Sequence, residues 1–276
     1  HLSDQFFSWK KSIELIFIWE FSSAVSPTSL GGSAVAFFVL SKEKLKAAKT
    51  ATIVLYTVVL DSAFLLLTLP IFFLFFGPAV LRPGGDPGGW MVYFITIYLL
   101  MLAYSGVFFY GIFIDPSKMK AALRGVTALP LLKRFREKAM ILGDDLMITS
   151  RELRQKPFSY HLKAFIATAF SWSFRFLLLN FIMLAILPDI SKNFWDQFQL
   201  YARIETMFFV IAFSPTPGGA GLIELLFNGF MSDYVTNTTS TTIISTIWRF
   251  LSYYIYFIVG AMIIPGWIRK IWRKKR

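Results

Sequence analysis

The sequence reads Ser-Pro-Thr-Ser-Leu-Gly-Gly over residues 26–32 and Ser-Pro-Thr-Pro-Gly-Gly over residues 214–219. Each stretch interrupts an otherwise apolar segment, and proline and paired glycines break helices. A break at matching points of two hydrophobic segments, far apart in one chain, is typical of membrane transporters built from inverted repeats. The two stretches therefore predict a helical membrane protein that contains a repeated, interrupted hairpin.

The composition also indicates a multi-pass membrane protein. Hydrophobic residues make up 56% of the chain and the mean hydropathy is +0.59, which is more apolar surface than a soluble domain of this size can bury. Crossing a bilayer core takes about 20 residues. Four apolar runs with at most one charged residue each are long enough: 51–77, 90–114, 164–187 and 241–266.

Residue counts exclude several kinds of site. The chain has no cysteine, which rules out disulfides and thiolate metal ligands, and its only histidines are His1 and His161. The sequence contains neither an Asp-rich metal-binding cluster nor a convincing Ser/His pair. We therefore expect no metal, no cofactor and no enzymatic activity.

The chain carries a net charge of +12, and the positions of its basic residues indicate how it is oriented in the membrane. Basic residues are concentrated in three stretches, which are 42–49, 115–159 and 267–276. The intervening loops hold only Arg82 and Lys192 as basic residues. By the positive-inside bias the basic stretches, including the C-terminus, are cytoplasmic. We expect anionic lipids at that face, and no nucleic acid, as the partner of this charge.

This orientation gives the two interrupted segments an unusual path. Residues 10–49 begin and end with cytoplasmic basic residues, whereas residues 197–233 begin and end on the opposite side. Neither segment can span, so each enters the membrane, turns at its break and returns. The predicted fold class is an all-α polytopic membrane protein with two inverted re-entrant helical hairpins. Non-helical backbone at that depth is tolerated only where protein or a water-filled cavity surrounds it.

The predicted organisation is a single transmembrane domain over residues 1–276. Its parts are a first repeat over about 10–114, a cytoplasmic amphipathic connection over 115–159, a second repeat over about 160–266 and a basic tail over 267–276. Because the chain starts at His1 and only a short polar stretch precedes the first hairpin, we expect further helices ahead of it.

The repeats also agree in register. Asp61 lies 35 residues after Ser26, and Arg249 lies 35 residues after Ser214. The lone charges of two spans therefore share one repeat position with opposite sign. This register predicts an Asp61–Arg249 ion pair near the centre of the bundle.

The breaks predict an anion site at mid-membrane. A helix that returns from each break begins with unpaired N–H groups and about half a positive charge. Glycine lets a ligand approach the backbone closely, and such helix termini bind phosphate or carboxylate. The candidate substrate-binding residues are Ser26, Thr28, Gly31, Gly32, Arg203, Ser214, Thr216, Gly218, Gly219 and Arg249. The alternative interpretation is that both breaks are plain packing kinks.

Acidic residues inside apolar segments form a second candidate set. A charge left alone at that depth costs about 2.5–3.5 kcal/mol on insertion scales, so such residues should face the interior and pair. The candidates for binding a head-group amine or a coupling proton are Glu20, Asp61, Glu205 and Glu224. Glu224 also has a structural interpretation, because it lies early in the second returning helix, where it would complement the dipole and pair with an arginine. For Arg175 we expect an internal partner or a lipid phosphate.

One motif extends beyond the second break. The string Ser214-Pro215-Thr216-Pro217-Gly218-Gly219-Ala220-Gly221 is followed by Glu224. It resembles the Pro-Thr-Pro-Gly-Gly-x-Gly-x-x-Glu signature of the lysylphosphatidylglycerol synthase transmembrane-region family, which includes the flippase half of the bacterial multiple peptide resistance factor. Glu205, the first break and Arg249 also match, and the resemblance covers essentially the whole chain. It implies a helical inner-membrane protein that moves a lipid or lipid-linked head group between leaflets. Because the sequence has no aminoacyl-transferase domain after Arg276, we expect no lipid aminoacylation.

Three functions fit the sequence to different degrees. The first is a flippase or transporter that moves a phospholipid or lipid-linked anionic head group across the bacterial cytoplasmic membrane. The second is a secondary transporter of a small soluble anion, which a cavity closed to lipid on all sides would favour. The third is an intramembrane enzyme that acts on a lipid phosphate. The sequence leaves open which lipid is moved, in which direction, with what energy source and whether the chain forms a homo-oligomer.

Overall fold

The structure is a computed structural model and describes residues 7–26, 39–43, 45, 47–81, 87–211, 214 and 216–273. Every regular element in these residues is helical. The α-helices are α1 (Trp9–Val25), α3 (Ala47–Phe76), α4 (Pro87–Phe109), α5 (Pro116–Val126), α6 (Arg136–Arg154), α7 (Phe158–Ile186), α8 (Phe194–Ile211), α9 (Leu222–Met231), α10 (Thr238–Arg249) and α11 (Ile255–Arg273). Short 3-10 segments are η1 (Gly77–Val80), η3 (Pro130–Phe135) and η4 (Pro217–Gly219), and π-helical segments are η2 (Tyr110–Ile114) and η5 (Phe250–Tyr254).

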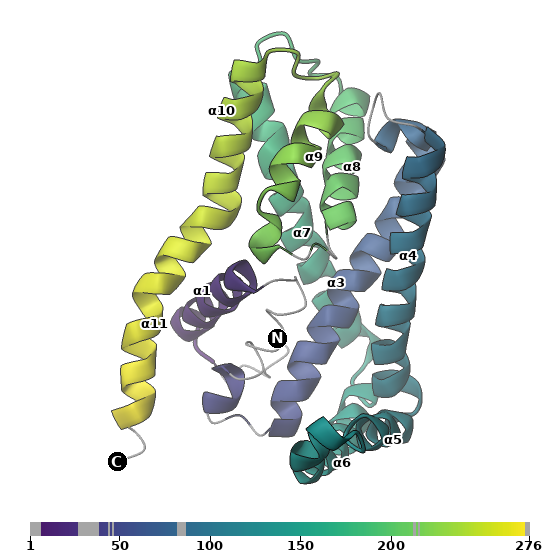
Figure 1. The fold of residues 1–276 in the computed structure, drawn as a ribbon, viewed down its shortest axis with the longest axis vertical. Helices are drawn as coiled ribbons and strands as arrows, with labels where there is room; N and C mark the ends of the chain where they lie inside the picture. The colour runs from purple at the N-terminus through teal and green to yellow at the C-terminus, as the bar shows by residue number, and fades with distance from the viewer. Residues whose placement is uncertain are drawn as a thin grey trace.

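Four helical stretches in the described residues are long and apolar enough to cross a membrane. They are Lys49–Val80, Gly88–Ile114, Phe158–Ile186 and Thr238–Ile271. They coincide with the four spans expected from the sequence to within a few residues, so the multi-pass helical class is confirmed. Figure 1 shows these helices running along the long axis of the molecule, with α10 and α11 joined into one long helix.

The outward faces of the long helices are apolar. On α4 the side chains of Val92, Leu99 and Val107 are exposed, and on α7 those of Phe170 and Phe174 are exposed. Scattered exposed apolar residues occur on soluble proteins, but rows of them along several helices indicate contact with lipid. These faces are therefore the lipid-facing surface of the bundle.

Pro70 stands inside α3 and removes one helical hydrogen bond. The carbonyl that loses its partner is that of Leu66, one turn earlier. In the structure the Tyr98 hydroxyl of α4 donates to this oxygen at 2.9 Å. An unsatisfied carbonyl in a membrane is costly, so this side chain from a neighbouring helix lets α3 continue through its proline.

The most buried part of the molecule surrounds α8 and α9. Phe209 and Phe230 are completely buried, and Phe176 of α7 and Phe227 of α9 are nearly so. Almost every residue of α8 after Leu200 is buried, so this helix is enclosed by protein on all sides. A helix that is apolar and buried all round belongs to the interior of the bundle rather than to its lipid-facing surface.

The helices α8 and α9 form an antiparallel pair at one end of the molecule. Figure 1 shows both connected to the long helices α7 and α10 by loops at the same end, with their other ends near mid-height. With 10 residues, α9 is about 15 Å long and too short to cross a hydrocarbon core of about 30 Å. The break that separates them, including η4, lies at this middle depth.

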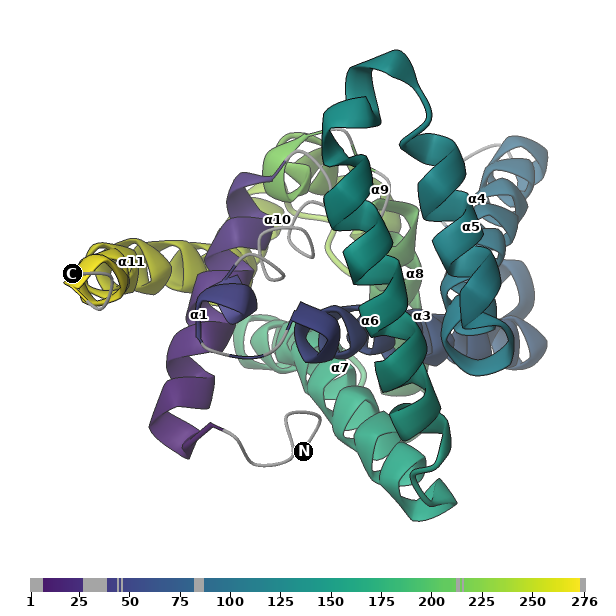
Figure 2. The same ribbon diagram turned by 90° about the horizontal axis from the view of Figure 1, so that it is seen from below.

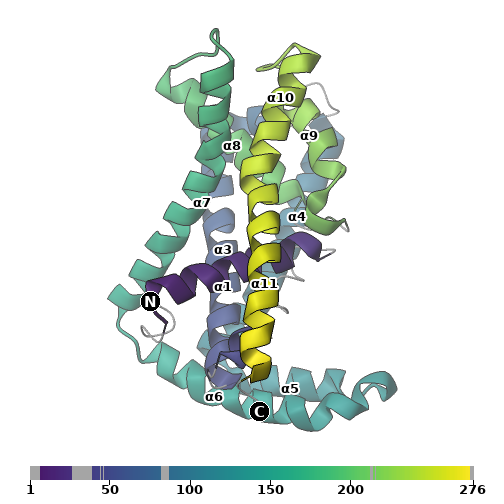
Figure 3. The same cartoon turned by 90° about the vertical axis from the view of Figure 1, so that its left-hand side faces the viewer.

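Helix α1 lies across the long helices rather than along them (Figures 1 and 3). It packs against α11 at Gly260, where a Cβ atom would come within 2.4 Å of Phe21 Cβ. The helix ends at Ser26, whose hydroxyl donates to the Ser22 carbonyl at 2.7 Å. The turn of the predicted first hairpin, at residues 27–32, lies outside the described residues.

Helices α5 and α6 lie crosswise at the opposite end of the molecule (Figures 1 and 2). The Asp115 side chain caps α5 by accepting from the Ser117 backbone N–H at 3.0 Å. A further hydrogen bond from the Ser117 hydroxyl lowers the pKa of the Asp115 carboxyl below its usual value. An ion pair between Lys120 and Asp144 joins the two helices. They lie within residues 115–159, for which the sequence predicts an amphipathic cytoplasmic connection.

Candidate functional site

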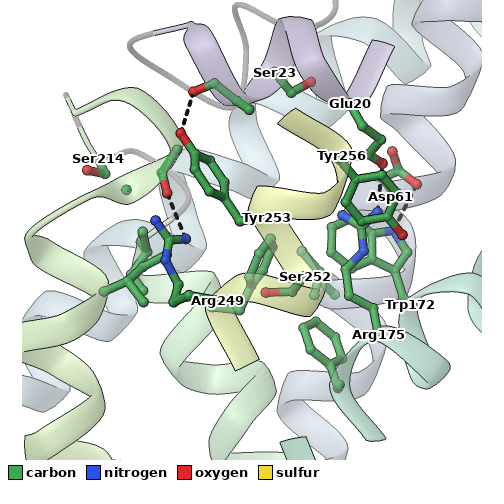
Figure 4. Close-up of a pocket in the computed structure, with 18 of the residues that line it drawn as sticks. Glu20, Ser23, Asp61, Trp172, Arg175, Ser214, Arg249, Ser252, Tyr253 and Tyr256 are labelled. Carbon is green, nitrogen blue, oxygen red and sulfur yellow. Dashed lines mark hydrogen bonds and ion pairs between the residues drawn. The ribbon is translucent and has the colours of Figure 1, made fainter. Parts of the chain in front are cut away.

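A cavity of about 300 Å³ lies beside the second break, where α1, α3, α7, α8 and the α10–α11 helix meet. Of the residues expected at a binding site, those that line it are Glu20, Asp61, Ser214, Thr216, Gly218, Gly219 and Arg249. Arg175 lines it as well. The structure therefore brings the second break together with Glu20, Asp61, Arg175 and Arg249, four of the charged residues found inside the apolar segments (Figure 4).

Arg249 forms one pole of the cavity, directly at the break. Its Nη1 donates to the Gly218 carbonyl at 3.2 Å, and its Nε lies 3.2 Å from Glu224 Oε1. Its guanidinium also lies over the Tyr253 ring, 4.3 Å from the ring centroid. The Tyr253 hydroxyl donates to the Ala24 carbonyl at 3.0 Å, which ties this pole to the end of α1.

The backbone of the break has conformations that favour glycine. Gly218, Gly219 and Gly221 have φ values of +55°, +68° and +82°. At Gly218 a Cβ atom would lie 2.1 Å from Cε2 of Tyr253, so the close ring contact also requires glycine there. Ser214 and Thr216 join their hydroxyls at 2.9 Å. The described residues of the break, Ser214 and Thr216–Gly219, thus include four that line the cavity.

The opposite pole holds an ion pair and a carboxyl group. Arg175 Nη2 donates to Glu20 Oε1 at 2.6 Å, so α7 and α1 are joined by the internal partner expected for Arg175. The Trp172 indole donates to Asp61 Oδ1 at 2.9 Å. The Arg175 guanidinium also lies over the Trp172 and Tyr256 rings, at 5.0 Å and 6.0 Å from their centroids. Figure 4 shows this group across the cavity from Arg249.

The predicted Asp61–Arg249 ion pair is not formed. Both residues line the same cavity, but Arg249 is paired with Glu224 and Asp61 accepts from Trp172. The shared register predicted two charges that line one cavity. It could not reveal that a cavity separates them, because repeat position says nothing about how far apart two helix faces lie.

Residues 4–260 match the family described as the lysylphosphatidylglycerol synthase TM region. The chain belongs to this family. It is also 25% identical over 274 residues to a UPF0104 membrane protein of Archaeoglobus fulgidus, an alignment that covers 92% of this chain and 75% of that protein. No solved structure matches the chain. The resemblance expected from the break motif is thereby confirmed, and the family match is to the transmembrane region of the synthase.

In this lysylphosphatidylglycerol synthase transmembrane-region protein, Glu224 has a structural role. Its Oε2 accepts from the Gly221 N–H at 2.7 Å, which satisfies one free N–H group at the start of α9. Its other oxygen pairs with Arg249. Glu224 does not line the cavity. These contacts agree with the structural interpretation of Glu224, in which its carboxylate complements the helix dipole and pairs with an arginine.

Arg203 and Glu205 lie away from the cavity. Arg203 is buried and donates to the carbonyl of Ala79 at 2.7 and 3.1 Å and to that of Phe230 at 3.3 Å, and it forms an ion pair with Asp233. These contacts join α8 to η1 and to the end of α9. Glu205 is completely buried against α3.

Of the candidate residues in the first break, Ser26 alone is described. It is buried at the end of α1 and does not line the cavity. Thr28, Gly31 and Gly32 fall outside the described residues. Of the two breaks, the second is therefore the one whose described residues line the cavity.

The sequence interpretation missed the aromatic residues of the cavity. Trp172 binds Asp61, Tyr253 holds Arg249 and α1, and Tyr256 lies under Arg175. In a chain that is 18% aromatic, no pattern separates these rings from those that face lipid. The one local signal is the position of Tyr253 four residues after Arg249, which places both on one helix face.

Proposed function

We propose that this chain moves a phospholipid or lipid-linked anionic head group between the leaflets of a membrane, through the cavity beside the second break. The observation that carries this proposal is the pair of poles inside one cavity of about 300 Å³. Two arginines and two carboxyl groups line it, on α1, α3, α7 and α10. Charged residues at such depth are costly and mark substrate pathways. Membership of a family linked to lipid flippase activity supports the same conclusion.

Arg249 and the break form the side suited to a phosphate. Among the described residues, Arg249 donates one hydrogen bond, from Nη1, and its buried Nε makes none although it lies 3.2 Å from Glu224 Oε1. The hydroxyls of Ser214 and Thr216 lie in the same wall. Arginine recognises phosphate through paired N–H donors, and a charge-assisted bond of this kind is about twice as strong as a neutral one.

Glu20 and Asp61 form the side suited to a cationic group. Asp61 has Trp172 as its hydrogen-bond donor and no ion-pair partner among the described residues. Glu20 shares Arg175, which an incoming amine could partly replace. A head group that carries both a phosphate and an amine therefore matches the two poles best.

The exposure of the Glu20–Arg175 pair favours a lipid over a soluble anion. Both residues line the cavity, yet their side chains are 26% and 30% exposed. Arg175 lies in the middle of the α7 span, so we propose that the cavity opens sideways, between helices, beside this pair. A lateral opening lets the acyl chains stay in lipid while the head group occupies the cavity.

We further propose that α8 and α9 are a re-entrant hairpin and that α1 belongs to its inverted counterpart. The proposal places the basic α5–α6 connection and the C-terminus on the cytoplasmic side of a bacterial inner membrane, against anionic lipids. In this proposal the chain is a single transmembrane domain with repeats over about 10–114 and 160–266. The buried position of α8 and the short length of α9 support it, because irregular backbone at membrane depth needs surrounding protein.

The proposal is tested with purified protein in vesicles that contain a fluorescent phospholipid, by adding an impermeant reductant that bleaches only the outer leaflet. Vesicles with the wild-type chain should lose fluorescence beyond the outer-leaflet fraction. Arg249→Gln removes a charge-assisted contact and should slow the movement about tenfold or more. The matched control is Arg269→Gln, an exposed arginine at the end of the same helix, which should leave the rate unchanged.

Two outcomes would contradict the proposal. One is lipid movement that is equal in the wild-type and Arg249→Gln proteins. The other is uptake of radiolabelled inorganic phosphate by the same vesicles without any lipid movement, which would assign the cavity to a soluble anion.

A further inference from the structure

Glu205 is a buried carboxyl group that the proposed lipid path does not use. It is completely buried in the wall between α8 and α3. Its Oε1 is hydrogen-bonded to the Thr68 hydroxyl, and its Oε2 is sealed from solvent with no hydrogen-bond partner. No lysine, arginine or histidine of the described residues forms an ion pair with it.

The hydrogen bonds of Thr68 bear on the protonation of Glu205. The Thr68 Oγ1 lies 2.8 Å from the Phe64 carbonyl, in the bond that threonine hydroxyls commonly make to the preceding helical turn. A hydroxyl has a single proton, and a carbonyl oxygen cannot donate one. Two arrangements satisfy these contacts: Thr68 donates to Glu205 Oε1, or Thr68 donates to the Phe64 carbonyl and accepts from the carboxyl group. The second arrangement needs a protonated carboxyl.

Burial favours the second arrangement. An ionised carboxylate at this position would have hydroxyl neighbours but, within the described part of the chain, no cation. A buried acid in such surroundings takes up a proton instead of remaining charged. The protonated form also needs fewer partners, because one of its oxygens becomes a donor.

The charged neighbours of Glu205 are engaged elsewhere. Tyr201, one turn earlier on the same helix, is a neutral hydroxyl within hydrogen-bonding reach of Glu205, and it also donates to Ser173 Oγ at 3.3 Å. The titratable groups at membrane depth on the other elements packed around α8 have their own partners, which are Trp172 for Asp61, Glu20 for Arg175, Leu66 for Tyr98, Arg249 for Glu224 and Asp233 for Arg203. None of them supplies a counter-charge.

The carboxyl group lies one helical turn from the cavity. Phe208 of α8 and Leu65 of α3 both line the cavity, and Glu205 and Thr68 lie three residues from them on the same helix faces. The pair is on the side of the cavity where α8 and α9 connect to their loops. A movement of α8 against α3 would separate the two groups and open the carboxyl to the cavity.

We propose that Glu205 is a proton-binding site, occupied in this conformation, which releases its proton when α8 moves against α3 during transport. The release step rests on the proposed function, whereas the occupancy does not. The ligand is a proton, and the atoms that hold it are a Glu205 carboxyl oxygen as donor and Thr68 Oγ1 as acceptor.

Infrared difference spectra of the full chain in lipid nanodiscs at neutral pH test the occupancy. Subtracting Glu205→Gln from wild type should leave the C=O stretch of a protonated carboxylic acid. Glu14→Gln is the matched control, because Glu14 pairs with Lys11 at 3.2 Å and should contribute only carboxylate bands. A spectrum in which Glu205→Gln removes carboxylate bands and no acid band would overturn the proposal.

The infrared spectrum of Thr68→Val is a second test, which leaves the carboxyl group in place. Because the protonated acid loses its acceptor, its C=O band should persist and shift. If the acid band instead appears only in Thr68→Val and is absent from wild type, Thr68 is the donor to an ionised Glu205 and the proposal fails.

The release step is tested in the lipid-movement assay with an imposed pH gradient. Wild-type transport should change with the gradient, and Glu205→Gln transport should lose that response. An unchanged response in Glu205→Gln excludes Glu205 from the cycle. Vesicles in which the wild-type chain moves no lipid contradict the proposed function, while the infrared result still decides whether Glu205 holds a proton.

Discussion

Arg249 and Arg175 face one cavity from opposite sides, and each is paired with a carboxylate. Each also lies against an aromatic ring, which holds the guanidinium in place and shields it from lipid. This arrangement keeps both charges at membrane depth without leaving either one unpaired. At the scale of single residues, the site is therefore a set of charges held by partners that a substrate can compete with.

Gly218 is the residue at which this arrangement is most sensitive to substitution. Its φ of +55° excludes most side chains, and a Cβ atom placed on it would lie 2.1 Å from the Tyr253 ring. Gly218→Ala should lower the free energy of unfolding by about 1–3 kcal/mol from backbone strain, with further loss from displacing Tyr253. Chemical unfolding in detergent, followed by tryptophan fluorescence, measures the change.

Gly106 provides the control for this prediction. It lies in α4 with no atom within 4 Å of a Cβ position, and Gly106→Ala should be neutral or stabilise the helix by about 0.5–1 kcal/mol. If Gly218→Ala unfolds at the same denaturant concentration as Gly106→Ala, the break does not have the conformation described.

At the scale of elements, the helices are interrupted where the fold supplies replacement partners. The proline in α3 removes the helical donor to the Leu66 carbonyl, and the Tyr98 hydroxyl of α4 donates to that oxygen instead. The start of α9 receives the Glu224 carboxylate in place of a helical acceptor. The last span contains the π-helical segment η5 directly after Arg249, and such segments are frequent at functional sites.

A double-mutant cycle tests the partner supplied to α3. Tyr98→Phe leaves the Leu66 carbonyl unsatisfied and should cost about 1–3 kcal/mol of unfolding free energy. Pro70→Ala restores the N–H that this carbonyl lacks, so Tyr98→Phe should cost much less in that background. The measurement is the unfolding free energy of the four proteins in one detergent. Equal costs of Tyr98→Phe in both backgrounds would mean that the hydroxyl does not replace the missing bond.

Some of these elements follow from the sequence and others do not. The four spans could be predicted because a span needs only length and hydropathy, and the place of the second break because Pro and Gly mark it. The partners of Arg249 and Asp61 could not, because they depend on how far each helix is rotated about its axis. The same limit applies to Arg203 and Glu205, which share α8 but face different neighbours.

At the scale of the whole molecule, the proposed hairpin determines which loops share a side of the membrane. A re-entrant α8–α9 hairpin places the loops before α8 and after α9 together, opposite the α5–α6 connection. Because the chain has no cysteine, single cysteines can be introduced without a background. Lys192, Thr236 and Ala128 are exposed positions in the three loops.

The hairpin predicts from which side of the membrane each introduced cysteine reacts. In intact cells an impermeant thiol reagent should label Lys192→Cys and Thr236→Cys, whereas Ala128→Cys should react only after permeabilisation. Labelling of positions 192 and 236 from opposite sides would show that residues between them cross the membrane, and the hairpin would be wrong.

The central claim is that a lipid head group occupies the cavity between Arg249 and the Glu20–Arg175 pair. The most direct measurement places a photoreactive amino acid at Ser252, which lines the cavity between the two poles, and identifies cross-linked lipid by mass spectrometry after illumination in native membranes. Phe174, which is 63% exposed on α7, serves as the lipid-facing control position. We predict a phospholipid adduct at 252 that is lost with Arg249→Gln, while the adduct at 174 is unchanged. Lipid captured at 174 but not at 252, or captured at 252 regardless of Arg249, would contradict the account.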